Sequence, residues 1–169
     1  GYVCYKYGLT SVLDIGCGTG TLATMIKARY SKTEVIGVDP DAQALAIATA
    51  KAGGAKLKID FVQGFADALP PIDTFAPGSF DCIVSTLAFH HLQRDQKLAV
   101  LKACVRLLKP GATMVIGDWG RASNILMRIL YYQVQVFDGF SNTTDNVEGR
   151  LPEFMRDAGL ISVEEIGAM

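Results

Sequence analysis

A carboxylate and three glycines in residues 12–20, V-L-D-I-G-C-G-T-G, carry the clearest chemistry in this chain. Gly16, Gly18 and Gly20 stand between an apolar run and a helix-like pattern, where a sharp turn needs residues without a Cβ. The first N–H groups of the following helix lack intrahelical partners and attract a carboxylate or a phosphate. Asp14, just before the glycines, can receive a cation. The combination suits a zwitterionic amino-acid group, whereas a pyrophosphate would gain nothing from Asp14.

The elements that must position this turn alternate between strand-like and helix-like patterns, which predicts an α/β fold with a parallel sheet and helices on both faces. Continuous apolar runs at Val35–Val38, Ile83–Val84 and Met114–Ile116 predict strands that are buried on both sides. Asp41–Ala52 is an alanine-rich segment that begins with a good N-capping residue, so it predicts a helix ending at Gly53–Gly54.

Three more helices are expected towards the C-terminus. Arg94–Lys109 carries Leu98, Leu101, Val105 and Leu108 on one face and stops at Pro110–Gly111. A second helix is expected over Ala122–Phe137, followed by a polar loop over Gly139–Asn146. A short helix then has Pro152 near its start and Gly159 past its end.

Five segments resemble, in order, the motifs of the class I S-adenosylmethionine-dependent methyltransferases. They are residues 12–20, 34–40 (E-V-I-G-V-D-P), 61–70 (F-V-Q-G-F-A-D-A-L-P), 80–92 and 107–118. The resemblance covers about residues 12 to 165. It implies a doubly wound, mostly parallel, Rossmann-like sheet in a single domain over residues 1–169, with S-adenosylmethionine as the cofactor.

The resemblance also implies where the cofactor binds. Asp39 stands where a Rossmann-like fold places an acid against the ribose hydroxyls. Phe65 replaces an acid that often receives the adenine amino group, and Asp67 should not be given that task by default. Phe65 could stack on the adenine while the Ala66 backbone supplies a hydrogen bond, or Phe65 could pack under the loop. The implied cofactor-binding residues are Asp14, Gly16, Cys17, Gly18, Gly20, Asp39, Pro40, Phe65, Ala66 and Ser85.

The candidate catalytic residues follow the fourth and fifth expected strands, because doubly wound sheets bind ligands at the carboxyl ends of their strands. His90 and His91 are the only histidines, and an imidazole can accept a proton near neutral pH. Asp118 could orient an acceptor or a histidine. In the alternative interpretation the histidines only fix their loop, and Asp118 only caps a helix.

The methyl acceptor is expected to be a small, partly apolar molecule. Trp119–Phe140 contains five aromatic residues (Trp119, Tyr131, Tyr132, Phe137 and Phe140), and residues 121–150 are a possible insertion on the acceptor side. The same aromatics could equally form core. The sequence leaves the acceptor atom open between oxygen, nitrogen, carbon and sulfur, and it leaves the oligomeric state open.

Composition sets further limits. Lys and Arg number 16 against 17 Asp and Glu, so the net charge of −1 predicts no nucleic-acid partner. Cys82 and Cys104 fall in apolar patterns and are expected to be buried free thiols, which indicates a reducing compartment. No apolar run approaches the roughly 18 residues of a membrane span. We therefore expect a soluble, cytoplasmic protein without a metal site.

The two ends suggest a shortened form of the fold. Only Gly1–Ser11 precede the first expected strand, and the sheet of the family continues with a strand near Ile161–Ile166 and an antiparallel partner. Two alternatives to a methyltransferase are a truncated, non-catalytic cofactor-binding module and an NAD(P)-dependent oxidoreductase. The oxidoreductase is less favoured, because Asp14 precedes a G-x-G-x-G run and no Y-x-x-x-K pair is present.

Overall fold

The computed structural model describes residues 9–66, 68–69, 75–118, 144–146 and 148–166. The chain divides into two compact units. The first unit contains residues 1–86 and 106–116, and the second contains residues 87–105 and 117–169. Whether residues 1–169 act as a single domain stays a prediction.

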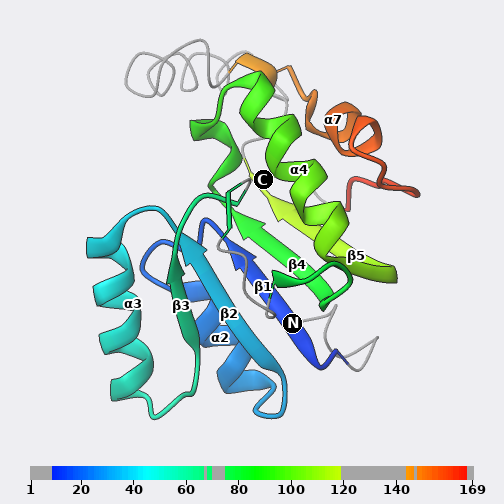
Figure 1. The fold of residues 1–169 in the computed structure, drawn as a ribbon. Helices are drawn as coiled ribbons and strands as arrows, with labels where there is room; N and C mark the ends of the chain where they lie inside the picture. The colour runs from blue at the N-terminus through cyan, green and yellow to red at the C-terminus, as the bar shows by residue number, and fades with distance from the viewer. Residues whose placement is uncertain (1–8, 67, 70–74, 119–143, 147, 167–169) are drawn as a thin grey trace. The chain divides into compact units, whose positions relative to one another are not determined.

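The first unit is built on a parallel sheet (Figure 1). Its strands are β1 (Ser11–Ile15), β2 (Glu34–Asp39), β3 (Asp60–Gln63), β4 (Phe80–Thr86) and β5 (Leu108–Gly117), in the order β3-β2-β1-β4-β5. β1 pairs in parallel with β2 and β4, and β2 pairs in parallel with β3. The predicted α/β class is therefore confirmed, and the carboxyl ends of these strands meet at one edge of the sheet.

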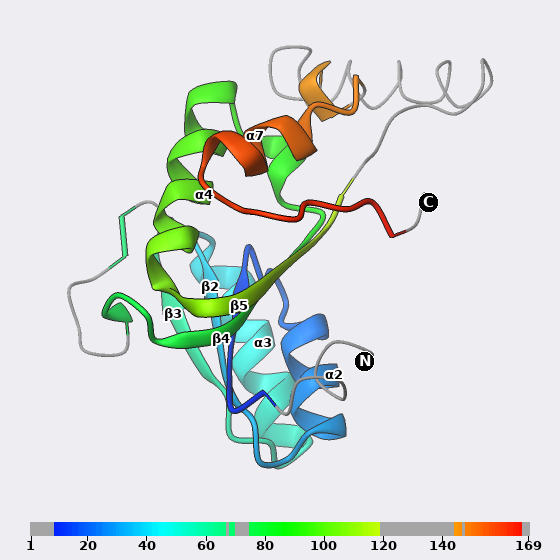
Figure 2. The same ribbon diagram turned by 90° about the vertical axis from the view of Figure 1, so that its right-hand side faces the viewer.

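Two helices of the first unit, α2 (Thr21–Arg29) and α3 (Ala42–Gly54), lie on the same side of the sheet (Figure 2). Asp41 caps α3, because its Oδ1 accepts hydrogen bonds from the N–H groups of Gln43 at 2.8 Å and Ala44 at 3.3 Å. The predicted helix and its cap are confirmed, although the helix continues through the two glycines at which we expected it to end.

The core of the first unit joins three strands to α2. Val12, Val35 and Cys82 pack with Ala23 and Ile26, and all five are buried. Cys82 is a free thiol, as predicted, and so is the buried Cys104. Burial raises the pKa of the Cys104 thiol to about 12, so it behaves as a small apolar side chain.

A carboxylate fastens the opposite, amino ends of β1, β4 and β5. Asp81 Oδ2 accepts from Thr10 Oγ1 at 2.6 Å and from the Thr10 and Ser11 N–H groups at 3.0 Å. Asp81 Oδ1 accepts from Lys109 Nζ at 2.9 Å. These bonds, the Thr10 hydroxyl first, hold the pKa of Asp81 far below its usual range.

The fifth strand corrects one prediction. Met114–Ile116 are half-buried rather than buried on both sides. β5 is the last strand in the order that the described residues form, so it has a strand neighbour only in β4.

The second unit contains the 3₁₀ turn η2 (Phe89–His91), most of α4 (Arg94–Leu107) and α7 (Leu151–Asp157). α4 ends at Leu107, two residues earlier than predicted, because Lys109 and Pro110 belong to β5. Its buried face also differs from the predicted one. Leu98 and Val105 are half-buried, whereas the fully or almost fully buried positions are Lys97, Val100, Leu101, Cys104 and Leu107.

In the C-terminal part of the described chain, only the predicted short helix is confirmed. α7 has Pro152 in its first turn, and Gly159 follows it with φ of 104°. Residues 161–166 form no strand, in contrast to the sheet of the family, and residues 144–146 of the predicted loop are helical. The predicted helix Ala122–Phe137 and the aromatic segment Trp119–Phe140 lie outside the described residues.

Candidate functional site

The glycine turn at the carboxyl end of β1 has the backbone that the sequence predicted. Gly16, Gly18 and Gly20 have φ angles of 67°, 50° and 70°, in the region that favours glycine. The N–H groups of Gly16 and Cys17 donate to the carbonyl oxygen of Val38 at 2.8 and 3.1 Å. The turn is therefore fastened to the carboxyl end of β2.

Two of these glycines have different surroundings. A Cβ on Gly20 would lie 2.7 Å from Ala48 Cβ and 2.9 Å from the Phe61 ring, so this glycine permits close packing of the turn. A Cβ on Gly18 would meet nothing within 4 Å among the described residues. The turn is packed on the Gly20 side and open at Gly18, where a ligand can approach the backbone.

Asp39, at the end of β2, joins the segments around the turn. Its Oδ2 accepts from the Gly18 N–H at 2.8 Å, and its Oδ1 accepts from the Asp41 N–H at 2.9 Å. Its carbonyl oxygen accepts from the Gly64 N–H at 3.1 Å, and the carbonyl of neighbouring Pro40 accepts from Gln63 Nε2 at 3.1 Å. The carboxylate therefore lies against the glycine turn, and its predicted contact with the ribose hydroxyls stays a prediction.

Asp14, inside β1, has no exposed surface. Neither carboxylate oxygen has a hydrogen-bond partner among the described residues. Burial is the main reason why the pKa of Asp14 rises to about 7; the nearby Ala23 N–H, which does not reach hydrogen-bond geometry with the carboxylate, opposes the rise, and the charge of Asp39 adds to it. A buried carboxylate without a partner is costly, so it marks a place where a cation or a donor is missing.

The other expected cofactor residues fall into exposed and buried groups. Phe65 is 60% exposed, so it does not pack under its loop, whereas Ala66 is buried. Ser85, near the end of β4, is buried, and its Oγ has no partner among the described residues. Burial, with the charges of Asp14 and Asp39, raises the pKa of the Cys17 thiol to about 12, so that thiol is inert. Asp67 lies outside the described residues.

In the second unit, His90 and Asp118 form a buried pair. His90 Nδ1 lies 2.8 Å from Asp118 Oδ1, and the His90 N–H donates to Asp118 Oδ2 at 3.1 Å. The exposed fractions of the two side chains are 7% and 1%. Asp118 thus contacts both the backbone and the imidazole of His90, and its catalytic role stays a prediction.

His91 has a different environment. It is exposed, and its ring centroid lies 3.9 Å from that of His90. The structure therefore distinguishes two histidines that the sequence treated alike. Of the two, His90 has the oriented imidazole.

A set of charged residues in the same unit was not predicted from the sequence. Lys97 is completely buried, and Asp145 is 3% exposed and pairs with Arg94. The signal was present in the sequence, since Lys97, Leu101 and Cys104 follow the i, i+4, i+7 spacing of one helix face.

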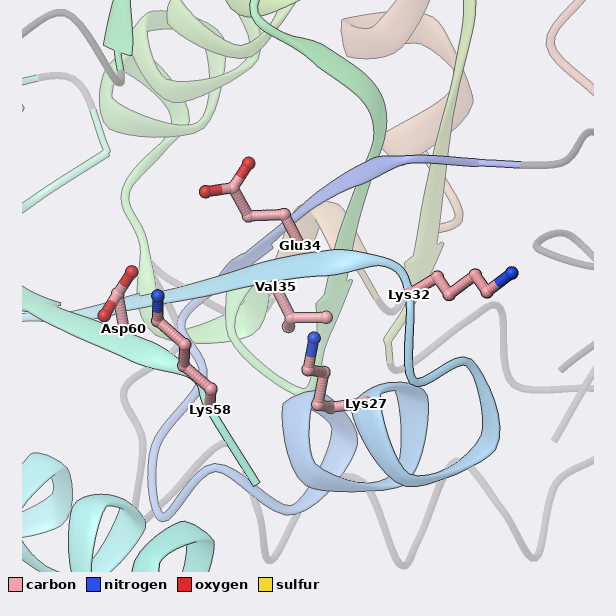
Figure 3. A pocket seen from close by; sticks show the side chains of 6 residues that line it. All are labelled: Lys27, Lys32, Glu34, Val35, Lys58 and Asp60. Carbon is pink, nitrogen blue, oxygen red and sulfur yellow. The ribbon is translucent and has the colours of Figure 1, made fainter. Parts of the chain in front are cut away.

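The pocket in Figure 3 belongs to the other end of the sheet. It is lined by Lys27, Lys32, Glu34, Val35, Lys58 and Asp60. Glu34 and Asp60 begin β2 and β3, whereas the glycine turn follows the carboxyl end of β1. Lys27 is also engaged, because its Nζ donates to the carbonyl oxygens of Ser31 and Thr33. This pocket has no part in the candidate site.

The described residues offer neither a metal-binding cluster nor a membrane-spanning helix. They contain no group of three or more His, Cys, Asp and Glu side chains that could hold a metal ion. Among them there is also no helix of the length and apolar character that crossing a membrane requires.

Comparison with known proteins identifies the family. The sequence profile of a family described as "Methyltransferase domain" matches residues 12–111, more than half of the chain. Demethylmenaquinone methyltransferase of Thermus thermophilus is 33% identical over 132 residues, which are 76% of this chain and 57% of that protein. Ribosomal RNA small subunit methyltransferase C of Hahella chejuensis is 30% identical over 133 residues, 71% of this chain and 36% of that protein. The chain thus spans about half or less of the length of these relatives.

A solved structure supports the same fold. Phosphoethanolamine N-methyltransferase 2 of Haemonchus contortus, in complex with phosphomonomethylethanolamine and S-adenosylhomocysteine, matches with a TM-score of 0.76 and 23% identity. The match covers 96% of this chain and 37% of that one, and it shows a Rossmann-like fold. With the profile match over residues 12–111, the glycine turn and the strand order, it follows that this chain belongs to the class I S-adenosylmethionine-dependent methyltransferases.

Proposed function

We propose that this protein transfers a methyl group from S-adenosylmethionine to a small-molecule acceptor. The observation that carries the proposal is the buried Asp14 carboxylate, which has no hydrogen-bond partner among the described residues, beside the open glycine turn. The cofactor has an ammonium group, which would give Asp14 the positive partner that it lacks. Membership of the family does not favour an NAD(P)-dependent oxidoreductase.

The residues of the first unit fit the rest of the cofactor. The first N–H groups of α2, which lack intrahelical acceptors, suit its carboxylate. Asp39 retains acceptor capacity for the ribose hydroxyls, since a carboxylate offers about four lone-pair sites and two backbone N–H groups use only some of them. The exposed Phe65 ring suits stacking on the adenine, with Ala66, Pro40 and Ser85 as further candidates.

Methyl transfer from S-adenosylmethionine requires little activation by the protein. The bound cofactor supplies a methyl group that its sulfonium already activates, so the protein has to align the acceptor for in-line displacement. A hydroxyl acceptor gains further from a general base, whereas an amine needs only desolvation.

We propose His90 as that base. A carboxylate that accepts from Nδ1–H fixes the imidazole tautomer and leaves Nε2 as the proton acceptor. The 2.8 Å contact between Asp118 Oδ1 and His90 Nδ1 supports this role for Asp118. The exposed His91 has no carboxylate partner of this kind among the described residues, so we give it no catalytic role.

We propose a small molecule as the acceptor, because one relative is named for demethylmenaquinone and because the net charge of −1 offers little attraction to phosphates. The relative named for ribosomal RNA makes RNA the competing acceptor that an experiment must include. The buried free thiols of Cys82 and Cys104 support a reducing, cytoplasmic location.

An acceptor screen tests the proposal. The purified protein is given S-adenosylmethionine with quinols, phenols, amines or ribosomal RNA, and the release of S-adenosylhomocysteine is measured. We expect turnover with a small molecule. With a hydroxyl acceptor, His90→Gln should lower turnover by about 10²–10⁴-fold, and His91→Gln should lower it far less.

Two outcomes would contradict parts of this proposal. Methylation of RNA alone would overturn the acceptor class. Near-normal turnover of His90→Gln with a true hydroxyl acceptor would show that catalysis is positioning alone. Tight cofactor binding without turnover on any acceptor would instead favour the non-catalytic module.

A further inference from the structure

Gly37 is a glycine inside a buried strand, where this residue type calls for a reason. Glycine weakens the interior of a strand, and it often marks a place where another part of the molecule approaches closely. Gly37 lies within β2, and its backbone does not have a positive φ. The space around it, and not its backbone conformation, therefore explains the glycine.

Two side chains fill the space above Gly37. A Cβ on Gly37 would lie 2.7 Å from Phe61 Cδ1, 2.8 Å from Phe61 Cε1 and 2.8 Å from Cys17 Sγ. These distances are much shorter than ordinary van der Waals contacts. The missing Cβ thus makes room for the Phe61 ring and the Cys17 thiol together.

Phe61 reaches this space from the neighbouring strand. β1, β2 and β3 lie side by side (Figure 1), and their register pairs Asp14 with Gly37 and Gly37 with Phe61. Paired residues of adjacent strands point to the same face of a sheet, so these residues form one row on that face. The Phe61 ring therefore extends over the glycine that separates it from Asp14.

The same ring also packs against the end of the glycine turn. A Cβ on Gly20 would lie 2.9 Å from Phe61 Cζ and 3.0 Å from Phe61 Cε1. The Gly20 N–H donates to the carbonyl oxygen of Cys17 at 2.8 Å, which closes the turn between these two residues. One aromatic ring thus packs against Gly20 and shares the space above Gly37 with Cys17.

We propose that Phe61 is a positioning residue for the cofactor, because its ring fills the space left by Gly37 and Gly20 and so holds the glycine turn in the conformation that binds S-adenosylmethionine. Gly18 lies between Cys17 and Gly20, and its N–H donates to Asp39 Oδ2 at 2.8 Å. The ring therefore supports the turn on both sides of the residue at which a ligand can approach. This inference rests on the proposed function only in placing the cofactor at this turn.

Calorimetric titration of Phe61→Leu with S-adenosylmethionine tests the inference. Leucine keeps an apolar side chain but has no atoms equivalent to Cε1 and Cζ, the ring atoms that face Gly20. A turn that can shift loses well-aligned contacts with its ligand. We therefore expect the affinity to fall by about tenfold, which is the effect of losing one good hydrogen bond.

Phe80→Leu is the matched control. Phe80 is the first residue of β4, at the opposite end of the strands from the glycine turn, and its ring centre lies 6.3 Å from that of Phe75. Phe80 is 2% exposed, whereas Phe61 is half-buried. The same truncation at Phe80 should lower the melting temperature at least as much as Phe61→Leu does, while leaving the affinity for S-adenosylmethionine unchanged.

Gly37→Ala tests the same contact from the other strand. The alanine needs no left-handed backbone, but its Cβ would displace the Phe61 ring from the space above position 37. We expect this variant also to bind S-adenosylmethionine about tenfold more weakly, although Phe61 itself is intact.

Binding and turnover separate this inference from the proposed function. An unchanged affinity in folded Phe61→Leu, or an equal loss of affinity in Phe80→Leu, overturns the positioning role. If Phe61→Leu does not fold, Gly37→Ala takes its place, and an unchanged affinity of that variant overturns the role as well. A loss of affinity confined to Phe61→Leu and Gly37→Ala supports the inference even if the unmodified protein methylates no acceptor, an outcome that contradicts only the proposed function.

Discussion

At the scale of single residues, two aspartates of the first unit show opposite uses of a carboxylate. Asp81 accepts hydrogen bonds from Thr10, Ser11 and Lys109 and stabilises the fold. Asp14 is buried in β1 and has no such partners in the part of the chain that the structure describes. Asp14 therefore costs stability in the free protein, and this cost is consistent with a role in binding.

The replacement Asp14→Asn should stabilise the free protein while weakening the binding of S-adenosylmethionine. Because the pKa of Asp14 is raised to about 7, the unfolded chain releases this proton at lower pH than the folded protein. The resulting loss of unfolding free energy grows between about pH 4 and pH 7 and is complete above that range.

At pH 8 the Asp14→Asn variant should gain on the order of 2 kcal/mol in the free energy of unfolding. The gain is smaller than the full loss caused by the charged carboxylate, because an unpartnered amide remains. Denaturant unfolding and calorimetry measure the two effects, and a variant that is less stable would contradict this account of Asp14.

Asp81→Asn should have the opposite effect on stability. The pKa of Asp81 is lowered in the folded protein, so its contribution is fully present above about pH 4 and is lost as the pH falls below that value. We expect the variant to lose about 1–3 kcal/mol of unfolding free energy at pH 7, since hydrogen bonds to a charged group are lost. Cofactor affinity should not change. A loss that persists undiminished at pH 2 would show that packing, and not the charge, is responsible.

The sequence revealed the type of these residues but not their surroundings. Asp14 was predicted as a binding residue from its position just before the glycines, and Asp39 from the position of the ribose-binding acid in Rossmann-like folds. The difference between His90 and His91 was not predictable, because it depends on which imidazole reaches Asp118, 28 residues further along the chain. Lys97 was missed because an isolated lysine is usually exposed, although its spacing from Leu101 placed it on the buried face.

At the scale of elements, local signals predicted β1, β2, β4, α3 and α7 well. Asp41 and Pro152 mark helix starts through local chemistry, which needs no tertiary information. The half-buried state of β5 depends on its place at the end of the strand order, which is a tertiary property. The predicted end of α4 was two residues too late. A proline shows only that a helix has ended before it, and it does not mark the last helical residue.

The glycine turn gives a prediction at this scale. Gly20→Ala should cost on the order of 2–4 kcal/mol of unfolding free energy, because a left-handed backbone is strained and the Cβ would meet Ala48 and Phe61. Gly18→Ala should cost only about 1–2 kcal/mol, since it has the backbone strain without a clash. It should nevertheless weaken cofactor binding, because the Cβ would fill the open side of the turn. Thermal unfolding with and without S-adenosylmethionine compares the two variants. An unchanged affinity of Gly18→Ala for S-adenosylmethionine would show that the cofactor binds elsewhere.

At the scale of the whole molecule, the profile match over residues 12–111 covers the glycine turn, the ends of β1 to β4 and the His90 turn. The fold class and the family were predictable because five short motifs occur in the expected order. The acceptor was not predictable, because the same scaffold serves acceptors of different chemistry, and the two relatives compared are named for a quinone and for ribosomal RNA.

Calorimetric titration of the purified protein at pH 7.5 tests the central claim, that the site around Asp14 and Asp39 binds S-adenosylmethionine. S-adenosylmethionine and S-adenosylhomocysteine should bind, and NAD should not. Asp39→Ala should weaken both affinities by about 1–3 kcal/mol, since it removes charge-assisted hydrogen bonds to the ribose, and Asp60→Ala at the other end of the sheet should not. Binding of NAD in place of S-adenosylmethionine, or unchanged affinity in Asp39→Ala, would contradict the account.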